Sequence, residues 1–280
     1  VGNVLTISGT PVNISDLTTY NYLIEVTSGT NQCTGTLSGS IQVHPTDELV
    51  LQTPGSISNM YCSGDTIAPI TYSFAGGTIG ANIQWTENGN PIANPLGIAS
   101  QLTANSLTIS GALLEDVTAT TTYSYTITSS NSGVCASNTT VSGTLTLNPK
   151  PNITLIPSGG QSNQLICEGD AITDIVYELS NGGNSFSIDW NSLPNGIITQ
   201  YDAAASRVTI SGVVQNINSD TSFTYTLTGI NQLTGCTSEI QTGTLQVSAA
   251  HELNLISGSN TATQEICEQT PLPYDIVYAF

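Results

Sequence analysis

Six cysteines are the residues of this sequence best able to do chemistry, and their spacing repeats about every hundred residues. They fall into two series of like spacing: Cys33, Cys135 and Cys236, and Cys62, Cys167 and Cys267. A zinc site needs paired Cys or His residues a few positions apart, and the sequence has no such pair. We therefore predict disulfide chemistry in an oxidising compartment, and export to the cell surface or the medium.

Catalytic arrangements are absent from the sequence. The two histidines, His44 and His251, lie more than two hundred residues apart, so no repeated Ser-His-Asp or Cys-His site can be built. The Gly-Gly pairs that begin at Gly76 and Gly182 connect expected strands, whereas a phosphate-binding loop joins a strand to a helix. We therefore predict no catalytic residues and no enzyme.

Calcium is the one cofactor with candidate ligands. Asp47 and Glu48 lie at an expected domain junction, and Asp65, Glu168 and Asp170 lie in a recurring turn. Carboxylate and carbonyl oxygens at such junctions are the ligands that Ca²⁺ takes. No Asp-x-Asp-x-Asp run is present, and Asp after Gly is a common turn residue. Turn formation is thus the favoured role, with structural calcium as the weaker alternative.

The charge of the chain excludes two classes of partner. Twenty acidic residues face only Lys150 and Arg207, giving a net charge of −18. Nucleic acid and anionic lipid surfaces are both bound through clustered Lys and Arg, so we predict no nucleic-acid partner. No run of eighteen apolar residues is present either, as a membrane-spanning helix would require.

The whole sequence repeats with the same period. The string Thr-Ile-Ser-Gly begins at Thr6, Thr108 and Thr209, in steps of 102 and 101 residues. A period of this length is a complete domain. We predict the end of one domain at residues 1–46, complete domains at 47–149 and 150–249, and the first strands of another at 250–280. We also expect the chain to be a piece of a longer protein.

The 150–249 copy predicts an all-β domain. Short apolar runs alternate with turns rich in Gly, Asn and Pro, and they predict strands at 153–156, 164–167, 171–179, 186–190, 197–201, 207–214, 223–229 and 236–247. Strands of this number and spacing are typical of a Greek-key β-sandwich. We therefore expect tandem immunoglobulin-like (PKD-like) sandwiches arranged head to tail.

Aromatic residues narrow this prediction to the immunoglobulin-like class. Trp85 and Trp190 follow Gly-Gly turns, where such a sandwich keeps a core Trp on its third strand. Tyr125 and Tyr225 lie later in their copies, in a pattern resembling the tyrosine corner at the start of strand F. We predict that all four aromatic side chains lie in the domain cores.

The cysteines depart from the antibody pattern, in which one bridge joins strands B and F. Here one cysteine precedes strand B and the other opens strand G, which places them at opposite ends of one sandwich. A bond between successive domains, Cys62 with Cys236, is therefore slightly favoured. Bonds within a domain (Cys62–Cys135 and Cys167–Cys236) come second, and bonds between sequence neighbours such as Cys135 and Cys167 come third.

In this order the motifs resemble a known family. Cys-x-Gly-Asp, Ile-x-x-Ile-x-Tyr, the Gly-Gly turn, the Trp, Thr-Ile-Ser-Gly, Tyr-x-Tyr and Gly-Thr-Leu are similar to the repeats of giant gliding-motility adhesins of the SprB type. The copy at Cys267 departs, with Cys-Glu-Gln-Thr in place of Cys-x-Gly-Asp. The resemblance implies type IX secretion and attachment to the outer membrane surface. It also implies that the secretion and gliding machinery of the outer membrane are partners, in addition to neighbouring repeats of the same chain. Surface polysaccharide is a further candidate partner.

These observations lead to two functional hypotheses. The first is a structural stalk or filament segment of a large bacterial cell-surface adhesin, serving gliding motility and attachment. A Pro-bearing linker such as 148–151 limits bending and suits that role. The alternative is a spacer or carbohydrate-binding array of a secreted polysaccharide-degrading enzyme, which an exposed strip of aromatic residues would favour.

Overall fold

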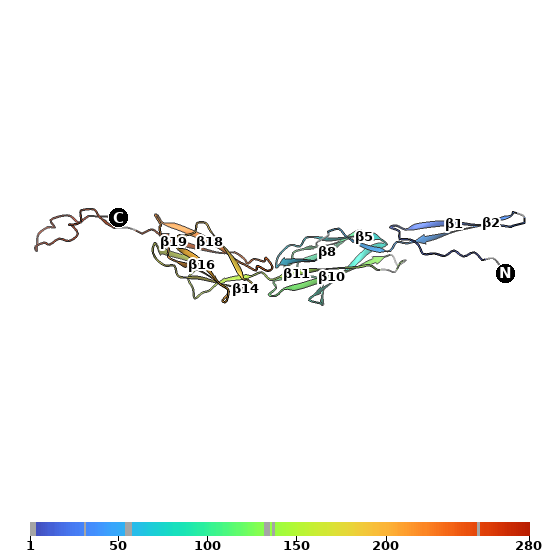
Figure 1. Cartoon of the computed structure of the whole chain (residues 1–280), viewed down its shortest axis with the longest axis horizontal. Coiled ribbons are helices and arrows are strands. Elements are labelled where there is room, and N and C mark those ends of the chain that lie inside the picture. Colours follow the sequence, from blue (N-terminus) through green and yellow to red (C-terminus); the bar gives the residue numbers. More distant parts are fainter. Residues whose placement is uncertain (1–3, 31, 54–57, 132–134, 136–137, 251–252) are drawn as a thin grey trace. The chain divides into compact units, whose positions relative to one another are not determined.

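The computed structural model describes residues 4–30, 32–53, 58–131, 135, 138–250 and 253–280. The chain divides into two compact units, Val1–Lys150 and Pro151–Phe280, and each is described by itself. Strands are the only regular elements among the described residues (Figure 1). Within that part of the chain, no helix has the length and apolar character needed to cross a membrane.

The first unit contains a complete β-sandwich, here called the second repeat (residues 47–149). One sheet has the order β3 (Asp47–Leu51), β5 (Ile70–Gly76), β9 (Ser106–Gly111) and β8 (Ile98–Leu102). The other has the order β4 (Ser58–Cys62), β11 (Thr140–Asn148), β10 (Thr121–Asn131), β6 (Thr78–Glu87) and β7 (Asn90–Ile92). In Figure 1, β10 and β11 lie below β5 and β8. This is the ABED and CFG arrangement of the immunoglobulin fold, with β4 added in parallel beside the last strand.

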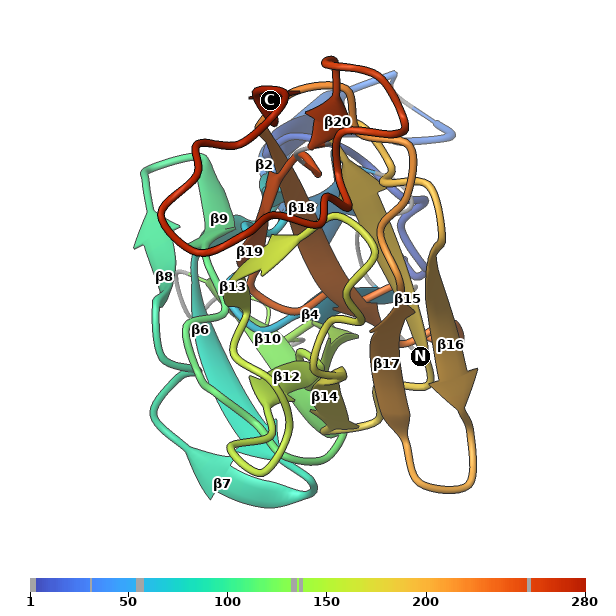
Figure 2. The same ribbon diagram turned by 90° about the vertical axis from the view of Figure 1, so that its left-hand side faces the viewer.

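The second unit contains a sandwich with the same strand order apart from β7, which has no counterpart among its described residues; it is here called the third repeat (residues 151–249). Its sheets have the orders β12 (Asn152–Leu155), β14 (Ile175–Ser180), β17 (Arg207–Gly212), β16 (Ile197–Asp202), and β13 (Asn163–Cys167), β19 (Gln241–Ser248), β18 (Thr221–Ile230), β15 (Ser185–Trp190). The neighbouring strands β16 and β17 are visible in Figure 2. The fold class is therefore tandem immunoglobulin-like β-sandwiches.

Two expected strands of the third repeat begin later than predicted. The run 171–179 is a strand only from Ile175, because Ala171 makes an isolated bridge to Val213. The run 236–247 is a strand only from Gln241. Cys236 lies in the preceding loop, where its carbonyl accepts the Asn231 N–H at 2.9 Å and Gly235 has a φ of 76°. This tight turn lies between the end of β18 at Ile230 and the cysteine.

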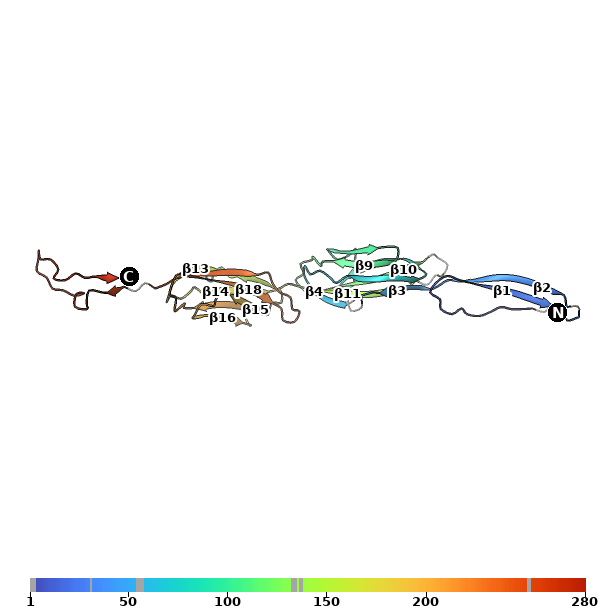
Figure 3. The same cartoon turned by 90° about the horizontal axis from the view of Figure 1, so that it is seen from above.

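Outside the two sandwiches, the described residues form two pairs of strands. In the first unit, β1 (Thr18–Thr27) and β2 (Thr34–Val43) form a hairpin, seen in Figure 3, whose register pairs Tyr22 with Gly39. In the second unit, β20 (Asn254–Leu255) pairs with β21 (Tyr278–Ala279). The hairpin repeats the pairing of Tyr125 with Gly143 in β10 and β11.

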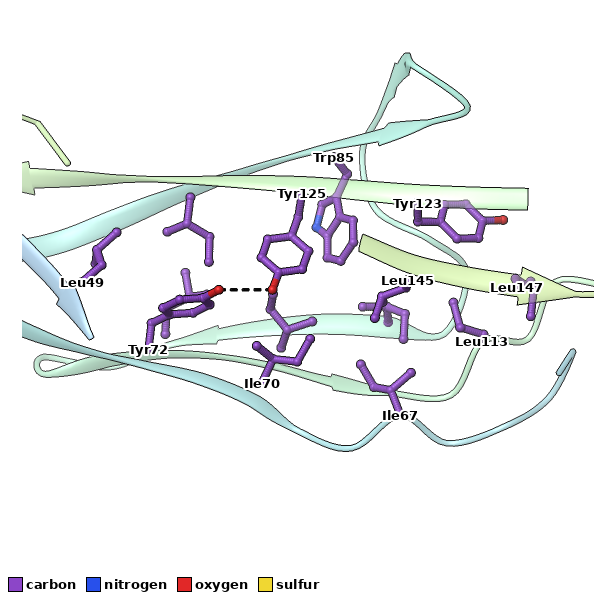
Figure 4. Close-up of a cluster of buried hydrophobic side chains, with 14 residues drawn as sticks. Leu49, Ile67, Ile70, Tyr72, Trp85, Leu113, Tyr123, Tyr125, Leu145 and Leu147 are labelled. Carbon is purple, nitrogen blue, oxygen red and sulfur yellow. Dashed lines mark hydrogen bonds between the residues drawn. The ribbon is translucent and has the colours of Figure 1, made fainter. Parts of the chain in front are cut away.

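Alternation of buried and exposed residues defines each core. Along β10, the side chains of Tyr123, Tyr125 and Ile127 point inward, while their neighbours lie nearer solvent. Such a period of two is what a strand with one buried face requires. Each repeat buries a single apolar cluster between its sheets. Figure 4 shows that of the second repeat, with β10 and β11 contributing from one side and Tyr72 and Ile70 from the other.

Candidate functional site

A pair of tyrosines joins the two sheets in the core of each repeat. Tyr72 on β5 and Tyr125 on β10 bring their hydroxyl oxygens within 3.2 Å of each other, as the dashed line in Figure 4 shows. In the third repeat, Tyr177 on β14 and Tyr225 on β18 make the same hydrogen bond at 3.0 Å. Both bonds join strand B to strand F, the two strands that a disulfide joins in antibody domains.

This pairing corrects the expected tyrosine corner. In that motif the hydroxyl bonds to the backbone a few residues upstream. Here the hydroxyls of Tyr125 and Tyr225 bond to tyrosines of the facing sheet. Burial is the main cause that raises the pKa of both phenols, and the hydrogen-bonded partner tyrosine raises it further. Both hydroxyls therefore stay neutral at physiological pH and serve the core.

A tryptophan packs on the strand F tyrosine in each repeat. The ring centroids of Trp85 and Tyr125 lie 5.3 Å apart, and those of Trp190 and Tyr225 lie 4.8 Å apart. Such tilted aromatic pairs add stability beyond the area they bury. Trp85 is only 2% exposed, whereas Trp190 is half-buried and its indole N–H lacks a hydrogen-bond partner. All four aromatics therefore belong to the domain cores, but Trp190 is less well enclosed.

The glycines opposite these tyrosines leave room for their rings. Gly143 and Gly243 are the register partners of Tyr125 and Tyr225. A Cβ atom at Gly243 would overlap the ring and hydroxyl of Tyr225. The same relation holds between Gly39 and Tyr22 in the hairpin. This close approach is the physical reason why Gly-x-Leu or Gly-x-Ile recurs with Tyr-x-Tyr along the chain.

The first pair of calcium candidates lies at the start of β3. Asp47 is 6% exposed, and its Oδ2 accepts bonds from Ser129 Oγ at 2.7 Å and Asn131 Nδ2 at 3.3 Å. Its Oδ1 is buried without a hydrogen-bond partner. Glu48 is exposed, and its N–H donates to Thr78 Oγ1 at 3.0 Å. Asp47 thus ties the start of the repeat to the end of β10.

The turn carboxylates lie apart from this pair. The Oδ2 of Asp65 accepts the Cys62 N–H at 2.8 Å, and the Asp65 N–H returns to the Cys62 carbonyl at 2.9 Å. Asp170 is exposed and donates its N–H to the Cys167 carbonyl. Across the described part of the chain, no three His, Cys, Asp or Glu side chains gather closely enough to hold a metal ion.

Glu168 has a larger structural role than the sequence suggested. Its two carboxylate oxygens accept the backbone N–H of Ile217 at 3.0 Å and of Ala250 at 3.2 Å. These backbone bonds, that of Ile217 first, lower the pKa of the carboxyl. Glu168 therefore joins the turn after β13 to the loop at Ile217 and to Ala250, just after β19. One sign of this role is visible in the sequence: the third repeat has Glu168 at the position where the second repeat has Ser63.

The cysteines have two different states. Cys62 and Cys236 are disulfide-bonded, whereas Cys135, Cys167 and Cys267 are free thiols. Cys33 is exposed and immediately precedes β2. The Cys135 Sγ lies 3.8 Å from the carbonyl oxygen of His44, which is half-buried, and His251 lies outside the described residues. The histidine nearest a thiol thus meets it through its backbone and not through its imidazole.

Two of the surface hollows among the described residues contain no catalytic group. One in the first unit is lined by residues 7–12 with Tyr20, Ile41 and Val43, and has a volume of about 420 Å³. Tyr20 is its single titratable side chain. Another, lined by Arg207 and Asp174 among others in the second unit, measures about 390 Å³. Neither hollow combines a nucleophile with a base, which covalent catalysis would require.

Of the comparisons with known proteins, only the one with solved structures found matches. No protein-family model matches the chain, and no curated protein matches it. Titin Ig tandem domains A164-A165 are 12% identical over 73% of this chain and 98% of that chain, with a TM-score of 0.28. The protocadherin GammaB4 extracellular domain is 11% identical over 82% of this chain and 37% of that chain, with a TM-score of 0.33.

A third similar structure is Dpr2 Ig1-Ig2 in complex with DIP-Theta Ig1-Ig3. It is 14% identical over 83% of this chain and 73% of that chain, with a TM-score of 0.26. At these values the similarities carry no argument about function. The class of the protein follows from its own sheets and from the period of its sequence, which together define a protein of tandem immunoglobulin-like repeats.

Proposed function

We propose that the chain is a structural stalk segment of a large bacterial cell-surface adhesin, used in gliding motility and surface attachment. One observation carries the proposal: the residues able to do chemistry serve the fold itself. The tyrosines join the sheets, and Glu168, Asp65 and Asp47 hold loops by hydrogen bonds. Side chains used in this way leave the repeats suited to spanning distance and transmitting force.

Location outside the cytoplasm is part of the same proposal. Cys62 and Cys236 are disulfide-bonded, and disulfides persist in oxidising compartments. The resemblance to SprB-type adhesins supports type IX secretion, association with the outer membrane, and contact with the gliding machinery. Acidic residues that outnumber basic ones by 20 to 2 suit a protein exposed to solvent along its length.

The alternative is a spacer or carbohydrate-binding array of a secreted polysaccharide-degrading enzyme. Sugar-binding faces use exposed aromatic rings, because the apolar face of a sugar stacks on them. In the described part of 47–249, the large apolar side chains that are well exposed are aliphatic or Met, as at Met60, Leu165 and Leu193. This observation favours the stalk, with surface polysaccharide meeting another part of the adhesin.

Exchange of the repeats in the parent bacterium tests the proposal. One strain carries two unrelated immunoglobulin-like domains of equal length in place of residues 47–249, and a second strain lacks these residues altogether. A stalk predicts that attachment and gliding persist in the exchange strain and weaken in the deletion strain. If the exchange abolishes attachment while the protein still reaches the surface, the repeats bind a ligand and the stalk proposal is wrong.

A further inference from the structure

A buried carboxylate at the start of the second repeat has a partner on one oxygen only. Asp47 is the first residue of β3 and is 6% exposed. Its Oδ2 accepts hydrogen bonds from Ser129 and Asn131, whereas its Oδ1 is buried without a partner among the described residues. A buried charge is costly unless it is paired or coordinates a metal ion. The second oxygen of Asp47 therefore calls for a positively charged partner.

The Lys and Arg side chains of the sequence do not serve Asp47. Lys150 and Arg207 are the only two. The Lys150 Nζ lies 3.6 Å from the place where a Cβ atom at Gly64 would lie, at the other end of the sandwich from Asp47. Arg207 belongs to the second unit, where it pairs with Glu178 at 3.7 Å. The negative charge of Asp47 thus has no Lys or Arg beside it.

Hydrogen bonds on one side of Asp47 fix how its carboxylate points. Ser129 Oγ, which donates to Oδ2 at 2.7 Å, accepts the Thr139 N–H at 2.8 Å. Thr139 Oγ1 in turn donates to the backbone carbonyl of Asp47 at 2.7 Å. These bonds hold both the side chain and the backbone of Asp47. They leave Oδ1 against Gly77, in the turn between β5 and β6.

A backbone carbonyl borders the same space as Oδ1. A Cβ atom at Gly77 would lie 3.1 Å from Asp47 Oδ1 and 2.8 Å from the Pro45 carbonyl oxygen. Because glycine has no side chain, both oxygens face the space in front of Gly77. Carboxylate and carbonyl oxygens are the protein ligands of Ca²⁺, and water completes its coordination. Pro45 also lines a surface hollow of about 400 Å³ in the first unit, through which an ion can enter.

The third repeat has neither the carboxylate nor the hydroxyl that binds it. By strand register, Pro151 takes the place of Asp47, and Gly229 takes the place of Ser129. A proline ring and a glycine bring no charge to be neutralised. The carboxylate and its donor are therefore present together in one repeat and replaced together in the other, which indicates that they serve one purpose.

We propose that Asp47 Oδ1 and the Pro45 carbonyl oxygen bind a Ca²⁺ ion at the start of the second repeat. Such a site needs no cluster of three acidic side chains, because backbone carbonyls and water supply the other ligands. With a single carboxylate we expect weak binding, with a Kd of about 1 mM, as in extracellular modules. The inference goes beyond the proposed function, because a spacer array of an enzyme would bind the ion equally.

Urea unfolding of the full chain, followed by Trp fluorescence, tests the site in each repeat separately. A Trp190→Phe background reports the second repeat, and a Trp85→Phe background reports the third. At a Kd of about 1 mM, adding about 10 mM CaCl₂ should lower the unfolding constant of the second repeat roughly tenfold, relative to NaCl of equal ionic strength. The third repeat should not change. No gain in the second repeat, or an equal gain in both, overturns the proposal.

Three variants then locate the ion. Asp47→Asn keeps the shape of the side chain and removes its charge, so the gain from Ca²⁺ should be lost. Gly77→Ala keeps the carboxylate but places a methyl group against both oxygens, so most of the gain should be lost as well. The matched control Glu48→Gln removes the neighbouring exposed carboxylate and should keep the whole gain.

The proposal is wrong if Asp47→Asn retains the tenfold gain, or if Glu48→Gln loses it. Should Asp47→Asn fail to fold, Gly77→Ala and the comparison between the second and third repeats still decide the question, because both keep Asp47 in place. None of these outcomes depends on whether the chain acts as a stalk.

Discussion

The second and third repeats share their centres and differ at their ends. Both place a tyrosine pair between the sheets, a tryptophan on the strand F tyrosine, and a glycine opposite it. These contacts fix the spacing and register of the sheets, so a change in one of them would disturb the others. The shared centre explains why the sequence period is visible at Tyr, Gly and Trp positions.

The two repeats use different acids to hold their loops: Glu115 lies between β9 and β10, and Glu168 follows β13. In the second repeat, Glu115 accepts a hydrogen bond from the Tyr123 hydroxyl. The third repeat has Phe223 at the corresponding place on β18, and Glu168 binds two backbone N–H groups instead. Glu115 also accepts the backbone N–H of Leu96 at 3.2 Å, so both acids bind backbone groups, but the two repeats carry them at different positions.

Removal of the tryptophans should give the largest effect and separate the two repeats. Truncating a fully buried Trp costs about 3–5 kcal/mol, so we expect that loss for Trp85→Ala in the second repeat. Trp190→Ala should cost less, because Trp190 is only half-buried. Hydrogen exchange of β10 and β18, measured by mass spectrometry in urea, reports each repeat separately. Equal losses would show that the two cores are equally well enclosed.

Alanine at the core glycines should affect both repeats alike. A Cβ at Gly243 would overlap Tyr225, and overpacking of this kind costs about 1–3 kcal/mol. Gly143 holds the same register position opposite Tyr125, so we expect a similar cost there. Each repeat has one Trp, so urea unfolding is followed by fluorescence in Trp190→Phe and Trp85→Phe backgrounds respectively. Gly35→Ala on β2 is the control, since its Cβ would meet no atom within 4 Å. Unchanged stability in Gly143→Ala would disprove the steric role of these glycines.

The Tyr123 hydroxyl should stabilise the second repeat alone. Tyr123→Phe removes the bond to Glu115 and should lower the free energy of unfolding by about 0.5–1.5 kcal/mol. The reciprocal change, Phe223→Tyr, should bring no gain. Thermal unfolding of both variants, beside the unmodified chain, measures the two effects. A gain in Phe223→Tyr equal to the loss in Tyr123→Phe would remove this difference between the repeats.

The smallest effect should be a pH dependence confined to the third repeat. The backbone bonds of Glu168 lower its pKa below the ordinary value of 4.5, so its contribution is present above that pH and lost as the pH falls. Glu168→Gln should therefore weaken the third repeat at neutral pH and flatten its loss of stability in acid. Urea unfolding at several pH values in a Trp85→Phe background measures this effect. The prediction is contradicted if Glu168→Gln loses as much stability in acid as the unmodified chain.

The sequence predicted the elements of the fold better than the contacts between them. Alternating apolar residues with glycine-rich turns located most strands of the third repeat to within two residues. The bond between Tyr72 and Tyr125 was not predictable, because it depends on which strands face each other across the core. The start of the last strand was misplaced for a local reason: after the turn that Asn231 and Gly235 close, residues 236–240 make only an isolated bridge, from Thr237 to Ile230.

Single-molecule stretching between the two ends of the chain tests most directly whether the repeats are built to carry load. We expect the second and third repeats to unfold in separate steps, each lengthening the chain by up to about 360 Å for roughly 100 residues at 3.6 Å per residue. Gradual extension at low force, without separate steps, would contradict the stalk.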